Sequence, residues 1–161
     1  MPIIQDYLLE ALKLAKKAES LGEVPVGAIV LYQGTIIGSG LNARESEQDP
    51  TRHAEIIAIQ AAARHLKSWR LLDCELYVTL EPCPMCLSAC QQARIKKVIY
   101  GAKDEKGGAI CLGFHVHQDS RLNHRFEVEY SPQEECSLIL KEFFSKKRGE
   151  KKSEKKLIPK A

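Results

Sequence analysis

The chain has 161 residues, of which 44% are hydrophobic and 28% are charged. This size and composition fit one globular domain that buries a core. No apolar run approaches the roughly 18 residues of a membrane span, and the N-terminal Met-Pro-Ile-Ile-Gln-Asp lacks the basic and apolar regions of a secretion signal. We therefore expect no membrane partner and a cytoplasmic location.

The charge is distributed unevenly along the chain. Residues 146–161 contain eight Lys or Arg and two Glu, a net charge of +6, whereas residues 1–145 contain 16 basic and 19 acidic side chains, a net charge of −3. We expect one domain over residues 1–148, followed by a basic, flexible tail over residues 149–161. Contact with a polyanion is the alternative role of this tail.

The cysteines do not indicate a disulfide framework, because no secretion signal accompanies them. In such a chain a Cys-x-x-Cys pair, here Cys83 and Cys86, is typical of metal binding or redox chemistry. The other four are interpreted as small core residues: Cys74, Cys90, Cys111 and Cys136.

The first elements in chain order are a helix and a hairpin. Apolar residues recur at helical spacing over residues 3–20, which predicts an amphipathic helix. Residues 24–32 and 35–41 form two short apolar runs, and Gln33-Gly34 between them is typical of a hairpin turn. Residues 42–50 are polar and rich in turn formers, so a loop is expected there.

Helices and strands alternate in the middle of the chain. Residues 53–66 are nearly all apolar and predict a buried helix, with Thr51 as its candidate cap. Residues 74–80 alternate with the period of a strand, and Pro84 suits the first turn of a helix that extends to about Arg94. A further strand over residues 97–101 completes a strand-helix-strand order, which implies partly parallel pairing in a layered α/β domain.

The C-terminal third is less regular. Residues 109–124 show no clear pattern, and residues 126–130 predict an edge strand. Residues 131–134 form a capping box with Pro132 at the first helical position, which opens a helix that carries apolar residues as far as Phe144.

Two short motifs can carry chemistry, His53-Ala54-Glu55 and Pro82-Cys83-Pro84-Met85-Cys86. One imidazole and two thiolates suit zinc, and a catalytic zinc keeps three protein ligands so that its fourth tetrahedral position holds water. We predict His53, Cys83 and Cys86 as the ligands of one Zn²⁺, where the N-termini of two helices converge. Glu55 lies too close in sequence to act as a fourth ligand and is better placed to transfer protons.

This site predicts hydrolysis. Zinc lowers the pKa of bound water from about 16 toward 7, which makes hydroxide available at neutral pH. Glu55 would take the proton and deliver it to a ring nitrogen and then to the leaving amine. The spacing His-x-Glu followed by Pro-Cys-x-x-Cys is that of the zinc-dependent nucleobase deaminases, in which an amino group becomes a carbonyl.

Two other interpretations of the metal motif stay open. Cys90 lies one helical turn after Cys86 and can close the coordination shell, which would make the zinc structural. A redox role for Cys83 and Cys86 is the other alternative, but it leaves His53 unexplained.

Several residues outside the motif also have two interpretations. His115 and His117 can chelate a metal but are more typical of a surface. Asn42 fits either a functional role or an Asx turn. Phe143-Phe144 is typical of a core, yet one of the two rings must face outward, where it can stack on a base beside Arg148.

Beyond these motifs, residues 5–148 resemble the bacterial tRNA-specific adenosine deaminases, which convert the wobble adenosine of an anticodon to inosine. The resemblance depends on these segments: Glu23-Val24-Pro25-Val26-Gly27, Asn42, His53-Ala54-Glu55, residues 76–83, Gly101-Ala102-Lys103-Asp104, Leu122-Asn123-His124-Arg125, Glu134-Glu135-Cys136 and Phe143-Phe144. It implies a homodimer with one zinc per subunit. It also implies the three-layer α/β/α fold of the cytidine deaminases, with a mixed, mostly five-stranded sheet.

The same resemblance implies roles for individual residues. The flipped base would be held by four of them: Val26, Asn42, the backbone of Ala54, and Leu80. The tRNA anticodon loop would be contacted by five others: Asp104, Lys106, Asn123, Phe144 and Arg148. The chain departs from the family at residues 109–113, where a Gly-Ser pair is usual, and at residues 131–133, which replace a more apolar stretch.

The first functional hypothesis is therefore hydrolytic deamination of adenosine to inosine at the wobble position of tRNA, because bases in RNA loops are extruded at least cost. The alternative is a small-molecule nucleobase or nucleoside deaminase that acts on guanine or cytosine. The net-negative body favours the alternative, whereas the basic tail and Phe144 with Arg148 favour RNA. A third hypothesis is a non-enzymatic RNA-binding or zinc-stabilised module, which predicts that Glu55→Ala leaves function intact.

Overall fold

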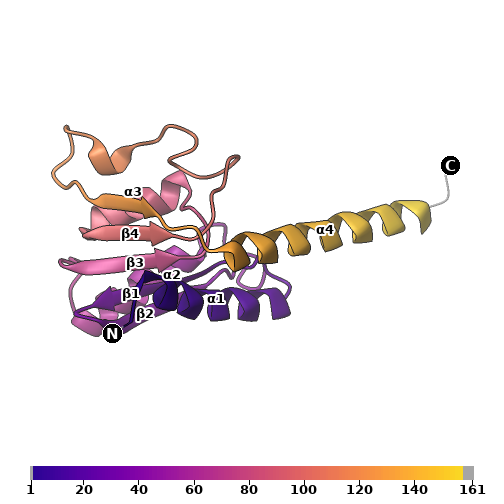
Figure 1. Ribbon diagram of the computed structural model, residues 1–161, viewed down its shortest axis with the longest axis horizontal. Coiled ribbons are helices and arrows are strands. Elements are labelled where there is room, and N and C mark those ends of the chain that lie inside the picture. The colour runs from indigo at the N-terminus through magenta and orange to yellow at the C-terminus, as the bar shows by residue number, and fades with distance from the viewer. Residues whose placement is uncertain (1, 158–161) are drawn as a thin grey trace.

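Five strands form one mixed sheet in the order β2-β1-β3-β4-β5 (Figure 1). In this computed structural model, which describes residues 2–157, the strands are β1 (Gly27–Tyr32), β2 (Thr35–Leu41), β3 (Cys74–Val78), β4 (Lys97–Tyr100) and β5 (Glu127–Tyr130). Strand β1 is antiparallel to β2 and β3, whereas β4 is parallel to β3 and β5. The expected mixed five-stranded sheet is confirmed.

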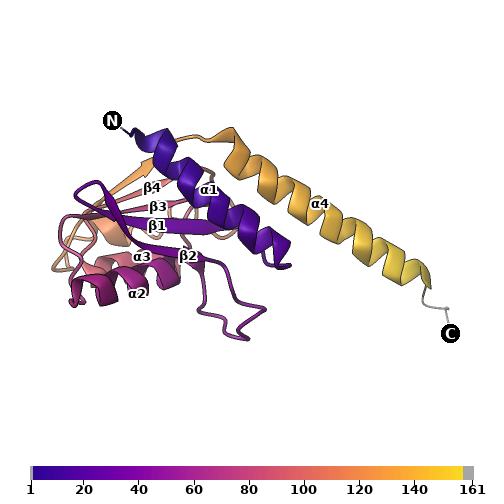
Figure 2. The ribbon, with the colours of Figure 1, turned by 90° about the horizontal axis from the view of Figure 1, so that it is seen from below.

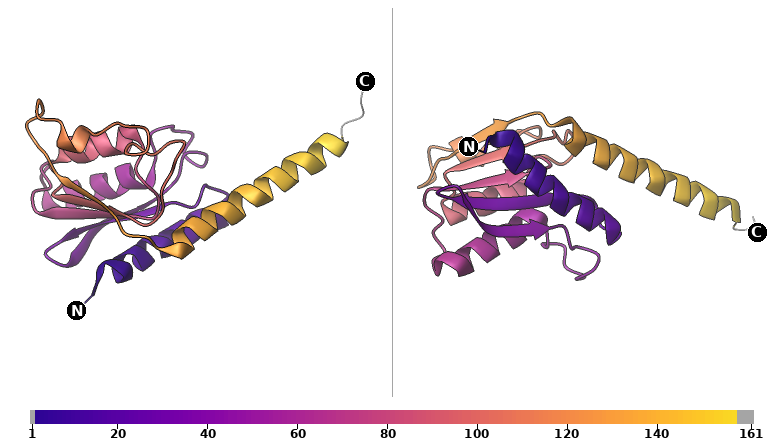
Figure 3. Two further views of the ribbon diagram at one scale, coloured as in Figure 1. Left: turned by 45° about the horizontal axis from the view of Figure 1, so that its top comes forward. Right: turned by 60° about the horizontal axis from the view of Figure 1, so that its bottom comes forward.

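Helices cover both faces of this sheet, which confirms the expected three layers (Figure 2). Helix α1 (Ile4–Ser20) covers one face, and α2 (Ala54–Leu66) and α3 (Pro84–Ala93) cover the other. Helix α4 (Glu134–Leu157) begins beside α1 and then extends past the rest of the molecule (Figures 1 and 3). None of the helices in residues 2–157 combines the length and the apolar character that crossing a bilayer requires.

The period of two along β1 explains how one sheet buries both faces. Ile29 and Leu31 pack with the side chains of α1, whereas Ala28 and Val30 belong to the larger core on the other side of the sheet. The turn after β1 places Gln33 and Gly34 at φ values of 50° and 76°. Two residues in the left-handed region are typical of a type I′ hairpin turn, so the predicted hairpin is confirmed.

Helix α2 packs directly against the backbone of β2. Ala54, Ala58 and Ala62 are fully buried and repeat every four residues along the helix. They lie opposite Gly38 and Gly40, where an added Cβ would come within 2.4 Å and 2.3 Å of the carbonyl oxygens of Ala58 and Ala54. Small residues on both elements therefore permit this close approach, and only the inner face of the helix is buried.

The structure corrects two predicted helix starts. Thr51 does not cap α2, because its N–H and hydroxyl both donate to Asp49 Oδ1, and His53 occupies the cap position instead. Helix α4 begins at Glu134 and not at Pro132. The N–H groups of Ser131 and Gln133 donate to the carbonyl oxygens of Tyr100 and Gly101, so this segment still belongs to the edge of the sheet.

The predicted boundary at residue 148 does not coincide with a change of structure. Helix α4 continues through Gly149 to Leu157, while residues 158–161 of the predicted tail lie outside the described residues. Lys and Glu dominate residues 150–156, and both are good helix formers, which explains why the helix continues after its apolar residues end.

Candidate metal centre and its cavity

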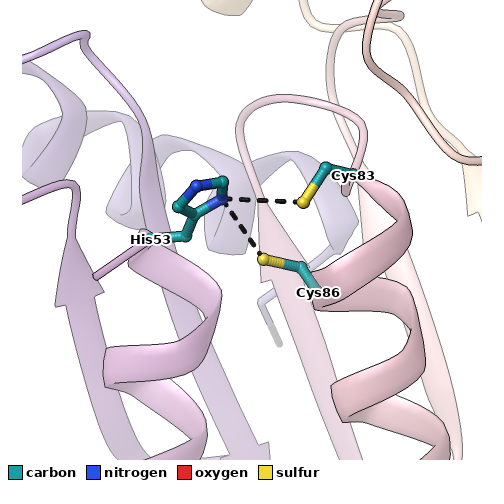
Figure 4. A group of neighbouring side chains, drawn as sticks. All are labelled: His53, Cys83 and Cys86. Carbon is teal, nitrogen blue, oxygen red and sulfur yellow. Dashed lines mark hydrogen bonds between the residues drawn. The ribbon is translucent and has the colours of Figure 1, made fainter. Parts of the chain in front are cut away.

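Two helix N-termini converge on the predicted metal ligands (Figure 4). His53 is the N-cap residue of α2, Cys83 is the N-cap residue of α3, and Cys86 lies in the first turn of α3 after Pro84. Pro84 is favourable there because the first helical N–H has no partner within the helix. The partial positive charge at both N-termini also favours thiolate over thiol.

The three donor atoms have the spacing of a zinc site. His53 Nδ1 lies 3.6 Å from Cys83 Sγ and 3.5 Å from Cys86 Sγ. A tetrahedral ion with Zn–N near 2.0 Å and Zn–S near 2.3 Å separates nitrogen from sulfur by about 3.5 Å. Within residues 2–157 these side chains form the one group of three or more His, Cys, Asp or Glu that could hold a metal, and Cys90 is not part of it. The residues therefore fit zinc with one coordination position left open.

The hydrogen bonds among His53, Cys83 and Cys86 shift the pKa values of all three side chains. Hydrogen bonds from Cys86 and then from His53 lower the pKa of Cys83 to about 4. The hydrogen bond to Cys83 also raises the pKa of His53, because the thiolate favours the imidazolium. Cys86 donates to Cys83 and is buried, so the pKa of Cys86 is raised. These hydrogen bonds therefore favour the thiolate form of Cys83.

Glu55 lies in the first turn of α2 and is only 4% exposed. Burial raises the pKa of this carboxyl, because the charged form loses water. Glu55 lines the same cavity as His53 and Cys83 but is not part of the metal group. Its position suits a group that accepts and releases a proton beside the metal.

A cavity of about 650 Å³ opens over the metal group. Val26, Ala54 and Leu80 line it, together with polar and charged side chains from three loops and apolar and basic side chains from α4. Its lining also includes Asn42, Arg44, Glu81, Lys103, Asp104, Lys106, Leu140, Phe144 and Arg148. Eight of the residues predicted to contact a base or RNA are therefore brought together around one cavity.

Comparison with known proteins agrees with this site. Residues 4–148 match the MafB19-like deaminase family. The chain is 50% identical over 150 residues to a tRNA-specific adenosine deaminase of Haemophilus influenzae, covering 92% of this chain and 87% of the relative. It is 49% identical to a protein of the same name from Aquifex aeolicus, covering 90% of this chain and 97% of the relative. The chain belongs to this deaminase family.

Two solved structures resemble the deaminase to different extents. A structure described as a tRNA A34 deaminase superposes with a TM-score of 0.80 and 37% identity, over 84% of this chain and 99% of the other. A guanine deaminase from Bacillus subtilis superposes with a TM-score of 0.61 and 40% identity, over 68% and 69% of the two chains. The tRNA deaminase structure therefore matches more of the deaminase than the guanine deaminase structure does.

Asn42 of the deaminase forms the predicted Asx turn and also lines the cavity. Its Oδ1 accepts the N–H of Arg44 at 3.3 Å, which is an Asx turn, and its Nδ2 donates to the Val24 carbonyl at 3.2 Å. The side chain is 6% exposed and lines the cavity. The turn fixes its orientation.

Asn123 is the one predicted RNA contact that does not line this cavity. The adjacent His124 approaches the Ile95 carbonyl through its Nε2 at 2.7 Å, just before β4, whereas the cavity lies beyond the other end of that strand. The loop with Asn123 is thus at the opposite end of the sheet.

The prediction of two surface histidines is half wrong. His115 is exposed, but His117 is 6% exposed and lies 5.9 Å from the Phe126 ring, measured between centroids. Residues 109–124 gave no periodic signal, so sequence reasoning could not locate the buried side of this segment.

Sequence reasoning also missed several residues that line the cavity, namely Val24, Arg44, Glu81, Lys103 and Leu140. Two of them could have been predicted from neighbouring site residues, because Glu81 directly precedes Pro82-Cys83 and Lys103 precedes Asp104. Leu140 gave no such signal, because its contact depends on how α4 crosses the end of the sheet.

Proposed function

We propose that the deaminase hydrolyses adenosine to inosine at the wobble position of a tRNA anticodon. The observation that carries this proposal is a metal group and a buried carboxyl at the base of a wide cavity whose rim holds an aromatic ring and several cations. The relatives named tRNA-specific adenosine deaminase support the choice of substrate. In the reaction, water adds its oxygen to C6 of the base and the amino group leaves as ammonia.

The residues of the chain divide this chemistry between them. A zinc ion held by His53, Cys83 and Cys86 would act as a Lewis acid that activates water in the open coordination position. Glu55 takes one proton from the attacking water and delivers it to a ring nitrogen, and it then takes the second proton from the added hydroxyl and delivers it to the leaving amino group. Its raised pKa suits this role, because the carboxyl must hold the proton between the two transfers.

The walls near the metal can hold one purine. Val26 and Leu80 provide apolar surface, and Asn42 presents a fixed amide. Ala54 lies at the first position of α2, where a backbone N–H has no helical partner and can donate to the base. These contacts can recognise a base that is flipped out of the stacked RNA.

The rim of the cavity has the character of a single-strand RNA site. Phe143 is 8% exposed and belongs to the core, whereas Phe144 is 44% exposed and presents a ring on which a base can stack. Lys106 and Arg148 line the same rim and can contact phosphates. Asp104 and Asn123 stay predicted RNA contacts. The Asp104 Oδ1 atom already accepts the N–H groups of Lys106 and Gly107.

The C-terminal part of α4 extends this basic rim. Phe144 and Arg148 line the cavity, and Lys151 and Lys155 follow on the same helical face at spacings of three and four residues. Truncation after Ser145 should therefore weaken tRNA binding and reduce its salt dependence. Unchanged conversion and unchanged salt dependence would remove α4 from the proposed RNA site.

Deamination of a free base is the alternative, and the guanine deaminase structure at 40% identity supports it. Transcribed tRNA with adenosine at the wobble position should be converted, with inosine read by reverse transcription, while guanine and cytosine stay unchanged. Conversion of free guanine or cytosine with untouched tRNA would reverse this order.

Glu55→Gln should bind zinc but lose turnover by about 10²-fold or more. Full activity of Glu55→Ala would instead favour a non-enzymatic module.

We also propose a homodimer that works in the cytoplasm, the compartment of its proposed tRNA substrate. Exposed apolar side chains occur in α3 and in the segment after Gly108, whose Ala109 N–H donates to the Pro82 carbonyl next to Cys83; they are Met85, Leu112 and Phe114. Phe114→Asp should lower the mass measured by light scattering toward that of one chain. Trp69→Asp, at an equally exposed side chain elsewhere, should not change it.

A further inference from the structure

We infer that Glu81 is a positioning residue that holds the 102–111 loop against the cavity and thereby places the cations that contact RNA phosphates. This inference rests on the proposed function. Glu81 is 2% exposed and lies between the end of β3 and the ligand Cys83. It links the rigid metal centre to a loop with no regular secondary structure of its own.

The 102–111 loop is hydrogen-bonded around Glu81. The Glu81 N–H donates to the Ala102 carbonyl and the Ala109 N–H donates to the Pro82 carbonyl, both at 2.8 Å. Between these anchors the Glu81 carboxylate accepts the N–H groups of Asp104 at 3.3 Å and Cys111 at 3.1 Å. The carboxylate thus occupies the inside of the loop.

Two further contacts make this arrangement specific. The Cys111 thiol donates to Glu81 Oε1 at 3.0 Å. A Cβ at Gly108 would lie 1.9 Å from Glu81 Oε2, so the loop backbone passes directly over the carboxylate. Within residues 2–157, no Lys or Arg forms an ion pair with Glu81. Backbone and thiol donors therefore satisfy this buried acid in place of a cation.

The loop presents its basic residues to the cavity. Lys103 and Lys106 both line it, and the Lys103 ammonium lies 5.0 Å from the centroid of the Tyr130 ring. If the carboxylate is removed, the loop loses its central acceptor and the two ammonium groups lose their fixed positions. The Glu81 carboxylate accepts its hydrogen bonds from Asp104 and Cys111 and not from the metal ligands or Glu55, so turnover at saturation should change less than recognition.

The test compares Glu81→Gln with the wild type on an anticodon stem-loop. We expect KM to rise about tenfold and kcat to fall less than threefold, because an amide replaces a charged acceptor and turns an N–H toward the loop donors. The slope of log KM against log salt should flatten by about 0.7 for each phosphate that the variant no longer neutralises. Zinc content should stay at one ion per chain.

A milder pair of variants covers the case in which Glu81→Gln fails to fold. Cys111→Ser keeps a donor to Glu81 and should retain the wild-type KM, whereas Cys111→Ala removes the donor and should raise it. The Lys103→Ala/Lys106→Ala double variant should flatten the salt dependence, and adding Glu81→Gln should flatten it no further.

Two results separate the failures. A wild type that leaves the stem-loop unconverted refutes the proposed function. A wild type that converts it, while Glu81→Gln and Cys111→Ala keep its KM and salt dependence, refutes this inference alone. A lower melting temperature with unchanged salt dependence also overturns it, because Glu81 would then be merely structural.

Discussion

Gly40 is the position where a single methyl group should separate catalysis from folding. Gly40 lies on β2 beneath the first turn of α2, and a Cβ there would approach the Ala54 carbonyl oxygen to 2.3 Å and the Ala58 nitrogen to 2.8 Å. Both atoms belong to helix backbone and cannot rotate away. The N-terminal end of α2, with His53 and Glu55, must therefore move outward in Gly40→Ala.

The size of the movement follows from the contact. A relaxed carbon-to-oxygen contact is about 3.3 Å, so the helix end must shift by about 1 Å. Overpacking of this kind costs about 1–3 kcal/mol, which lowers the melting temperature of a chain of this size by several degrees. A displacement of about 1 Å at catalytic groups can lower the rate about 10²-fold. Zinc affinity should also fall, because His53 moves and Cys83 does not.

Gly38→Ala is the matched control. Its Cβ would meet the Ala58 carbonyl oxygen at 2.4 Å and the Ala62 nitrogen at 2.7 Å, an equal clash one helical turn farther from the metal. Both variants should therefore lose similar stability in urea denaturation, but only Gly40→Ala should lose most of its zinc and turnover. Equal losses of turnover, or normal zinc content in Gly40→Ala, would refute this account of how α2 places its ligands.

Three further predictions test the site and the fold. Cys90→Ala should keep one zinc per chain by elemental analysis while Cys86→Ala loses it, and metal loss in Cys90→Ala would indicate a closed structural site. Gly149→Ala should raise the melting midpoint of α4 in circular dichroism, because Ala is favoured in a helix by about 1 kcal/mol and no atom lies within 4 Å of the added methyl. Burial and the nearby His115 lower the pKa of His117 below 6.5, so the unfolded chain binds more protons and stability should fall as pH drops below 6.5. His117→Phe should flatten this pH dependence in urea denaturation, and an unchanged dependence would contradict it.

Local patterns predicted most of the fold because each element is short and has its own start or stop signal. The two metal motifs were readable for the same reason, since His53 and Cys83 each stand at a helix start, where the backbone N–H groups have a regular geometry. The prediction that one of the rings of Phe143 and Phe144 faces outward is confirmed, because adjacent residues on a helix cannot both face the core.

Features that depend on contacts between residues far apart in the chain could not be predicted from the sequence. The burial of His117 depends on Phe126, and the end of α4 depends on residues whose helix propensity competes with their like charges. The interpretation of Cys111 as a small core residue was wrong, because this cysteine is exposed. Its thiol and N–H both donate to Glu81, thirty residues earlier in the chain.

Glu23 resembles Glu81, because its buried carboxylate also accepts hydrogen bonds from a neighbouring loop. It is 1% exposed and accepts the N–H and hydroxyl of Ser46 at 2.6 Å and 2.9 Å. Burial alone would raise the pKa of Glu23, but these hydrogen bonds outweigh it and lower the pKa. Hydrogen-bond donors thus satisfy both buried acids, and the charge of Arg44 adds to the lowering of the Glu23 pKa. Within residues 2–157 neither Arg44 nor Lys103 forms an ion pair, and both line the cavity, so an anionic ligand can meet their positive charge there.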